Sequence, residues 1–418
     1  MYVLLIIGGL KSEQFKLDLE RTMTKPLQGT RILDLTRLLP GPFITQLLAD
    51  MGAEVIKVET PTAGDYSRLA PPEMGLGGLF EMINQGKRSV AINYRNPRGR
   101  EVFLKLVSTC DVVIESFRPG TAERMKIDYE TLQTINPNLV YCALSGYGQA
   151  GPYSKRAGHD LNYTAISGAL SLNAVEGKPP QMYGLTVADL SGAMMAGMAI
   201  LGALLNRQKS GQGMYLDVAL LDGILSWMIP MAGAAFFQGV PVTGGTLPLQ
   251  GGLACYNVYE TADGRFISLG ALEPTFWSDF CKVTGRNDLL PRQFDRAIKE
   301  DVAAIFKGRS LADWLEMFAE SDGCVEPVLS FEETLTHPQV MARGFVREEQ
   351  GRPVGLNSPF AYGGGEARPA PGLGEHTRLI LSEVIPSEEL EELMRSGVLG
   401  KRELSSSRTG NKARDDSS

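Results

Sequence analysis

The sequence predicts an α/β protein with a large Rossmann-like parallel-sheet domain and a smaller α+β domain. From residue 30 to residue 144, short apolar stretches alternate with helical ones, a rhythm typical of a parallel sheet covered on both faces. A different pattern follows residue 253, where two short strands flank Asp263-Gly264, a dipeptide that favours a hairpin. A chain of 418 residues is long enough to bury two cores.

The expected elements of the large domain follow in chain order. Strands are expected over 31–35, 54–59, 89–93, 111–115, 138–144 and 214–220. A turn at 39–42 precedes the expected helices, which cover 43–51, 98–108, 129–134, 191–207 and 221–228. The first turn lacks Gly-x-Gly-x-x-Gly, which argues against a dinucleotide-dependent dehydrogenase. Ligands of such sheets bind at the carboxyl ends of the strands, near a switch point.

In the smaller domain, strands are expected over 256–260, 265–269 and 324–329, and helices are expected from 275 and within 301–320. A terminal helix is expected after this domain, over 378–394. The predicted division is 1–23 extension, 24–220 large domain, 221–252 linker, 253–344 small domain, 345–373 returning linker, 374–404 C-terminal helix and 405–418 tail. The tail is polar and charged without apolar periodicity, so we expect it to be disordered.

Composition excludes several classes of protein. A net charge of −7 and a pI near 5.3 argue against a broad nucleic-acid surface. The five cysteines show no close pair or zinc spacing and are typical of reduced thiols. The apolar stretch 3–10 is too short to span a bilayer and lacks the basic region of a signal peptide. We therefore expect a cytoplasmic protein with no metal site and no membrane or nucleic-acid partner.

Two candidate catalytic residues occur in one stretch of the large domain. His159 is one of three histidines, and Asp189 stands just before the helix expected over 191–207. There its carboxylate could accept free backbone N–H groups and face the positive end of the helix dipole. The stretch itself leaves open whether Asp189 is only a cap and His159 only structural. Glycines within the helix, at 192, 197 and 202, are tolerated where a backbone or ligand approaches closely.

Charged residues elsewhere suggest further site residues. Pro274 suits the first position of a helix, which makes Glu273 its cap. Glutamate is not a favoured cap, so Glu273 is a candidate site residue. Six basic residues fall after or beside strands, where phosphates bind in such sheets: Lys57, Arg68, Lys87, Arg88, Arg118 and Arg124. The alternative for each is solvated surface charge.

Nine short motifs together carry a family resemblance over residues 24–385. They are Leu-Pro-Gly-Pro (39–42), Val-Ile-Lys-Val-Glu (55–59), Asn-Gln-Gly-Lys-Arg-Ser-Val (84–90), Glu-Ser-Phe-Arg-Pro-Gly (115–120), Gly-Tyr-Gly-Gln (146–149), Gly-His-Asp-Leu-Asn-Tyr (158–163), Thr-Ala-Asp-Gly-Arg (261–265), Gly-Ala-Leu-Glu-Pro (270–274) and Gly-Glu-His-Thr (374–377). In this order and spacing the chain resembles the class III CoA-transferase superfamily, of CaiB/BaiF type. Within it, the chain is most similar to the α-methylacyl-CoA racemases.

The resemblance implies a role for each candidate. His159 and Asp189 match the racemase acid–base residues, and Asp189 also matches the nucleophile of the transferases. Glu273 matches a glutamate that the small domain of a partner subunit supplies. The resemblance further implies an interlocked homodimer and no cofactor beyond the coenzyme A of the substrate. Residues that match coenzyme A nucleotide contacts are Lys57, Lys87, Arg88 and Arg118.

The reaction has alternatives. The Gly-His-Asp-Leu-Asn-Tyr segment favours a racemase that moves a proton through an enolate, because well-known transferases lack that histidine. Racemases usually carry Met-Leu-Asp-Gly-Gly before the small domain, whereas residues 247–252 read Leu-Pro-Leu-Gln-Gly-Gly. A transferase acting through an aspartyl–CoA thioester is the second hypothesis. A protein that binds CoA esters without turnover is the third.

Overall fold

The computed structural model describes residues 25–69, 78–360 and 368–400. The extension expected over 1–23 and the tail expected over 405–418 lie outside these ranges. The chain divides into two compact units, which we call the large unit (up to 157, 189–223 and from 358) and the small unit (158–188 and 224–357). This division places 158–188 in the small unit, whereas the division made from the sequence kept that segment in 24–220.

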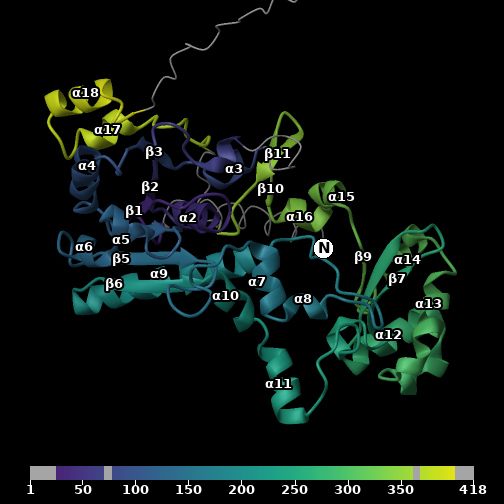
Figure 1. Cartoon of the computed structure of the whole chain (residues 1–418). Coiled ribbons are helices and arrows are strands. Elements are labelled where there is room, and N and C mark those ends of the chain that lie inside the picture. The colour runs from purple at the N-terminus through teal and green to yellow at the C-terminus, as the bar shows by residue number, and fades with distance from the viewer. Residues whose placement is uncertain (1–24, 70–77, 361–367, 401–418) are drawn as a thin grey trace, which may run out of the picture. The chain divides into compact units, whose positions relative to one another are not determined.

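A six-stranded parallel sheet forms the large unit, and it confirms the predicted fold class (Figure 1). Its strands are β1 (Arg31–Asp34), β2 (Glu54–Glu59), β3 (Arg88–Ala91), β4 (Val112–Glu115), β5 (Val140–Ser145) and β6 (Met214–Ala219). All six lie where the sequence predicts them. The order β3-β2-β1-β4-β5-β6 reverses direction between β1 and β4. The carboxyl ends of these two strands therefore form the switch point at which ligands bind in such sheets.

Helices cover both faces of this sheet. A buried apolar core joins one face to α4 (Pro97–Val107), α5 (Thr121–Met125), α6 (Tyr129–Gln133), α17 (Thr377–Leu381) and α18 (Ser387–Arg395). The single terminal helix predicted over 378–394 is wrong: it is split into α17 and α18, with Pro386 as the N-cap of α18. Proline lacks the N–H that a continuous helix needs at that position. Short elements elsewhere in the large unit are η1 (Tyr66–Leu69) and α3 (Leu79–Ile83).

Two helices, α2 (Pro40–Asp50) and α9 (Val187–Ser210), pack against each other. The turn predicted at 39–42 is wrong in part, because α2 already begins at Pro40, which occupies a favoured first helical position. A Cβ on Gly197 of α9 would lie 2.3 Å from Ile44 Cδ1. α9 is also long and apolar enough to span a bilayer by length and composition alone, and half of its most apolar stretch is buried. That burial fits the core position of α9.

The first turns of α9 meet α10 (Leu220–Ser226) backbone against backbone. A Cβ on Gly192 would lie 2.8 Å from Leu220 Cα, and a Cβ on Gly223 would lie 2.6 Å from Gly192 Cα. The close backbone approach predicted for the α9 glycines is thus confirmed at Gly192, whereas the close neighbour of Gly197 is the side chain of Ile44. At Gly202 a Cβ would meet no described protein atom within 4 Å, so no backbone of this chain approaches there.

The small unit contains the predicted α+β domain. An antiparallel sheet of order β7-β8-β9 combines β7 (Tyr256–Glu260), β8 (Phe266–Gly270) and β9 (Val325–Pro327). Three helices, α12 (Pro274–Thr284), α13 (Lys299–Phe306) and α14 (Leu311–Phe318), build its core around stacked aromatic rings such as Trp277 and Phe280, 5.0 Å apart. The hairpin predicted around Asp263-Gly264 is confirmed, and Gly264 adopts a φ of 75° that suits glycine.

Several elements of the small unit were not predicted. The segment expected to be a linker over 221–252 contains α11 (Ile229–Gln238), and the one expected over 345–373 contains the hairpin of β10 (Val346–Glu349) and β11 (Arg352–Leu356). α11 consists almost entirely of apolar residues, so it has no polar face by which the sequence would show an amphipathic helix, and none of its residues is buried. Further short helices are α7 (Asp160–Ile166), α8 (Ala169–Leu172), α15 (Phe331–Thr336) and α16 (Pro338–Ala342).

Candidate active site

The start of α9 differs from the prediction in a way that bears on Asp189. The helix begins at Val187, so Asp189 lies within the first turn and is not a cap that precedes the helix. The carboxylate of Asp160 accepts the Ala188 N–H at 2.7 Å and so satisfies one of the free donors of that turn. Asp160 was not identified from the sequence as a site residue. An aspartate in the first turn of a helix, here α7, is nevertheless a recognisable signal of a helix N-terminus.

His159 is the N-cap residue of α7, and its side chain is exposed. Its backbone N–H donates to Asn162 Oδ1 at 3.0 Å, which fixes the backbone that carries the imidazole. The other two histidines have structural positions. His376 Nδ1 accepts the Ser89 N–H at 3.3 Å, and His337 stands between α15 and α16. Of the three histidines, His159 has an exposed side chain, whereas His337 and His376 are half-buried. A role of His159 in proton exchange stays a prediction.

One hydrogen bond connects the chain neighbours of the two candidates. Asp160 follows His159, and Ala188 precedes Asp189, so the 2.7 Å bond between Asp160 and Ala188 ties the two backbones within one residue of each candidate. By the division above, His159 belongs to the small unit and Asp189 to the large unit.

Glu273 is the N-cap residue of α12, with Pro274 at the first helical position, as predicted. Its carboxylate makes no capping hydrogen bond, and the side chain is exposed. Partial burial, and then the charge of Glu273, raise the pKa of the Cys324 thiol. A site role for Glu273 stays a prediction. Its carboxylate is not used to cap the helix.

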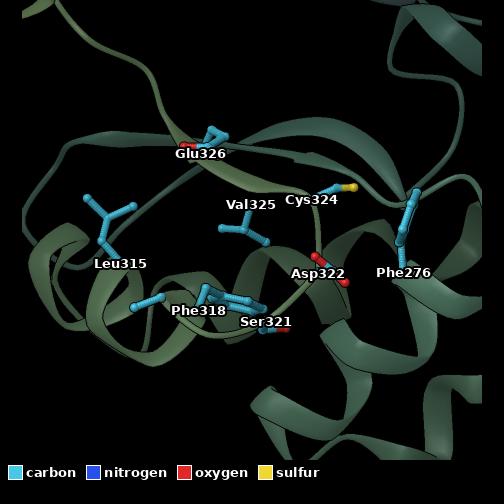
Figure 2. A pocket seen from close by; sticks show the side chains of 9 residues that line it. Phe276, Leu315, Phe318, Ser321, Asp322, Cys324, Val325 and Glu326 are labelled. Carbon is cyan, nitrogen blue, oxygen red and sulfur yellow. The ribbon is translucent and has the colours of Figure 1, made fainter. Parts of the chain in front are cut away.

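A cavity of about 380 Å³ lies in the small unit next to Cys324. Figure 2 shows the sulfur of Cys324 pointing towards Phe276, with the carboxylate of Asp322 nearby. The charged residues that line this cavity, Asp322 and Glu326, are both acidic. Phosphate groups bind beside cations, so this cavity is unsuited to the nucleotide of coenzyme A.

Lys57 and Lys87 are not surface residues. They are 1% and 2% exposed, and both face Asp34, whose Oδ2 lies 3.9 Å from Lys57 Nζ and 3.3 Å from Lys87 Nζ. Burial alone would raise the pKa of Asp34, but the two ammonium groups outweigh it and hold that pKa at about 2. Burial lowers the pKa of Lys87. The alternative that these two lysines are solvated surface charges is therefore wrong.

The other two predicted nucleotide contacts are more exposed. Arg88 is the first residue of β3 and pairs at 2.8 Å with Glu54, the first residue of β2. It thus lies at the amino ends of these strands. Arg118 lies in the loop after β4, beside the switch point, and lines a cavity of about 260 Å³. Burial, and then nearby carboxylates, raise the pKa of Glu115 in the same cavity to about 8. Nucleotide contacts by Arg88 and Arg118 stay predictions.

Comparison with known proteins gives the family. The chain matches CoA-transferase family III over residues 27–377. It is 34% identical over 400 residues to the succinyl-CoA:glutarate CoA-transferase of Mus musculus, with 91% of each chain covered. It is 35% identical over 385 residues to the alpha-methylacyl-CoA racemase of Homo sapiens, covering 88% of this chain and 96% of that one. The crystal structure of a CAIB/BAIF family protein from Brucella suis is 30% identical, with a TM-score of 0.75 and coverage of 87% and 100%. This chain belongs to CoA-transferase family III.

Proposed function

We propose that the protein is an α-methylacyl-CoA racemase, which inverts the carbon next to the thioester through an enolate. The observation that carries the proposal is the bond from Asp160 to Ala188, which ties the backbones beside His159 and Asp189 together. An imidazole and a carboxylate are the two groups that an acid–base pair requires. The similarity to the human racemase, at 35% identity, supports the same reaction.

The proposed chemistry needs one group on each face of the substrate. Asp189 or His159 removes the proton from the carbon next to the thioester carbonyl, and the other group returns a proton to the opposite face. The two exchange roles with the direction of the reaction. Negative charge builds up on the thioester oxygen in the enolate and must be stabilised. The first turn of α9, with its partly positive end, places Asp189 where an ionised carboxylate is favoured.

A CoA transferase is the second candidate, and the similarity to the Mus musculus glutarate transferase favours it. In that reaction Asp189 attacks the thioester carbonyl and displaces the thiolate of coenzyme A, which gives an acyl–aspartyl anhydride. The thiolate then attacks the aspartyl carbonyl, releases the first acid and forms an aspartyl–CoA thioester. An acceptor carboxylate completes the transfer by the reverse steps. In that reaction His159 would take no part in the chemistry and would serve only as the N-cap residue of α7.

The proposal includes a homodimer in which a partner subunit supplies Glu273. Support comes from α11, where Phe236 and Phe237 are 80% and 90% exposed and no residue is buried. Large exposed apolar side chains on one helix are typical of an interaction surface. The exposed carboxylate of Glu273, which caps no helix donor, is available to a second chain.

The deciding experiment is solvent exchange of the α-proton. A racemase should raise the mass of a 2-methylacyl-CoA by one unit in deuterium oxide, without any acceptor acid, while the α-centre epimerises. Several acyl chains should be tried, since residues 247–252 differ from the usual racemase segment. A transferase leaves the α-proton in place, needs a carboxylate acceptor and builds an Asp189 adduct that hydroxylamine traps. No exchange with several esters, together with CoA gain by an acceptor, would refute the racemase. Binding without either reaction would leave a CoA-ester-binding protein.

A further inference from the structure

Buried charged side chains form hydrogen bonds with the backbone of the loop between β1 and α2, residues 35–39. Lys57 Nζ donates to the carbonyl of Thr36 at 3.0 Å, and Asp65 Oδ1 accepts the N–H of Leu38 at 3.1 Å. Lys57 and Asp65 also pair with each other at 2.9 Å, and both are 1% exposed. The two side chains thus bind backbone groups on either side of residue 37.

Lys87 holds the first turns of α2, which follow the loop. Its ammonium donates to the carbonyl of Pro42 at 2.8 Å, to Thr45 Oγ1 at 2.8 Å and to Asn84 Oδ1 at 2.8 Å. The Asp34 carboxylate at 3.3 Å is its counter-charge. The loop and the first turn of α2 are therefore fastened to the sheet at three backbone groups.

Leu38, between these fastening points, has a φ of 64°. This left-handed conformation crowds the Cβ of any residue other than glycine. The Leu38 side chain is 39% exposed and lies outside the buried core. The bond from its N–H to Asp65 is the contact that directly holds this strained backbone.

This loop follows β1 and so flanks the switch point between β1 and β4. We infer that Lys57, Asp65 and Lys87 are positioning residues for the coenzyme A nucleotide, because they hold the backbone of this loop in the shape that the ligand meets. The inference rests on the proposed CoA-ester function. It replaces the expectation that the two lysines bind the nucleotide directly.

Burial explains why these lysines act through the loop. Each ammonium already has a buried carboxylate and a backbone carbonyl as partners. Turning one outwards to a phosphate would leave Asp65 or Asp34 as an unpaired buried charge, which is strongly unfavourable.

The test measures the Kd of coenzyme A itself by calorimetry. Asp65→Ala removes both the charge and the oxygen that accepts the Leu38 N–H, and we expect it to raise Kd about tenfold. Adding Leu38→Gly should recover most of that loss, since glycine adopts a positive φ without crowding. Leu38→Gly alone should keep Kd within about twofold. The matched control is Lys105→Met, which removes a charge 47% exposed on α4 and should leave Kd unchanged.

Lys57→Met separates positioning from direct phosphate contact. A positioning lysine should leave the salt dependence of Kd as in the wild type, and Leu38→Gly should again restore affinity. A lysine on phosphate should flatten the salt dependence when removed, and Leu38→Gly should give no rescue. That second pattern would overturn the inference.

The positioning role can still be tested if these variants do not fold. If Asp65→Ala and Lys57→Met do not fold, Leu38→Val is compared with Leu38→Gly in the otherwise wild-type chain. A β-branched residue is disfavoured at positive φ, so Leu38→Val should bind coenzyme A about tenfold more weakly. Equal Kd values would refute the positioning role. A wild-type protein that does not bind coenzyme A would instead refute the proposed function.

Discussion

Replacement of two glycines in α9 by alanine should have opposite effects, although both lie in the same helix. Gly202→Ala adds a methyl group in open space and removes the helix penalty of glycine, so we expect about 0.5–1 kcal/mol of added stability. Gly192→Ala places its methyl group 2.8 Å from Leu220 Cα, where ordinary contact begins at 3.4 Å. The helices must separate by about 0.6 Å at that point.

This separation has a cost in stability and in rate. Overpacking of a core contact costs about 1–3 kcal/mol, so Gly192→Ala should be less stable than the wild type even after the gain in helix propensity. Asp189 lies one turn earlier in α9, so it moves with that turn. A displacement of this size at a reacting carboxylate should lower kcat about tenfold to a hundredfold.

The assay combines denaturant unfolding with kcat and KM on the substrate that the exchange experiment identifies. Gly202→Ala controls for the added methyl group, since it should keep the wild-type kcat. If Gly192→Ala matches Gly202→Ala in both stability and kcat, the contact between α9 and α10 does not position Asp189. The reasoning would then be refuted.

Four further predictions concern the site and its surroundings. Asp189→Ala should abolish turnover by either mechanism while circular dichroism stays that of the wild type; near-normal turnover would contradict the assignment. Asp160→Ala should cost about 1 kcal/mol in unfolding experiments and lower kcat, whereas Asp160→Asn, which keeps an acceptor oxygen, should do less harm. Co-refolded His159→Ala and Glu273→Ala chains should regain activity, since one site of the mixed dimer has no substitution; confirmed heterodimers without activity would argue for a site within one chain. Burial raises the pKa of Glu115 in the folded protein from 4.5 to about 8. Its carboxyl group therefore destabilises the folded state increasingly as the pH rises from about 4.5 to about 8. Glu115→Gln should therefore raise the free energy of unfolding more at pH 9 than at pH 5, by at most about 5 kcal/mol, and an equal gain in Tm at the two pH values would contradict it.

The parallel sheet was predictable because β1 to β5 are almost wholly buried and read as short apolar runs, whereas only β6 is largely exposed. Local patterns also identified Glu273 as the N-cap of α12, since the signal is the proline that follows it. α11 was not predictable by the same means. None of its residues is buried, and its apolar side chains mark no face of a core.

The details of the site depend on contacts that are distant in sequence. Asp189 was expected just before the helix because the residue that accepts the Ala188 N–H, Asp160, is 28 residues away and could not be identified from the local sequence. Lys57 and Lys87 follow the motif positions expected of phosphate contacts, and only the folded chain shows them buried against Asp34. Sequence gives the residue type and its place along a strand, but not which groups meet it.

Both reactions of the proposal use the same carboxylate, and the structure fixes the backbone of that carboxylate without reference to either reaction. Asp160 holds the N–H of Ala188, and Gly192 lets the first turns of α9 approach α10. These contacts serve Asp189 equally as a base or as a nucleophile. On this proposal, the choice between proton transfer and acyl transfer is expected to depend on His159 and the segment 247–252. The deuterium-exchange experiment tests the role of His159, and variation of the acyl chain tests the role of the segment 247–252.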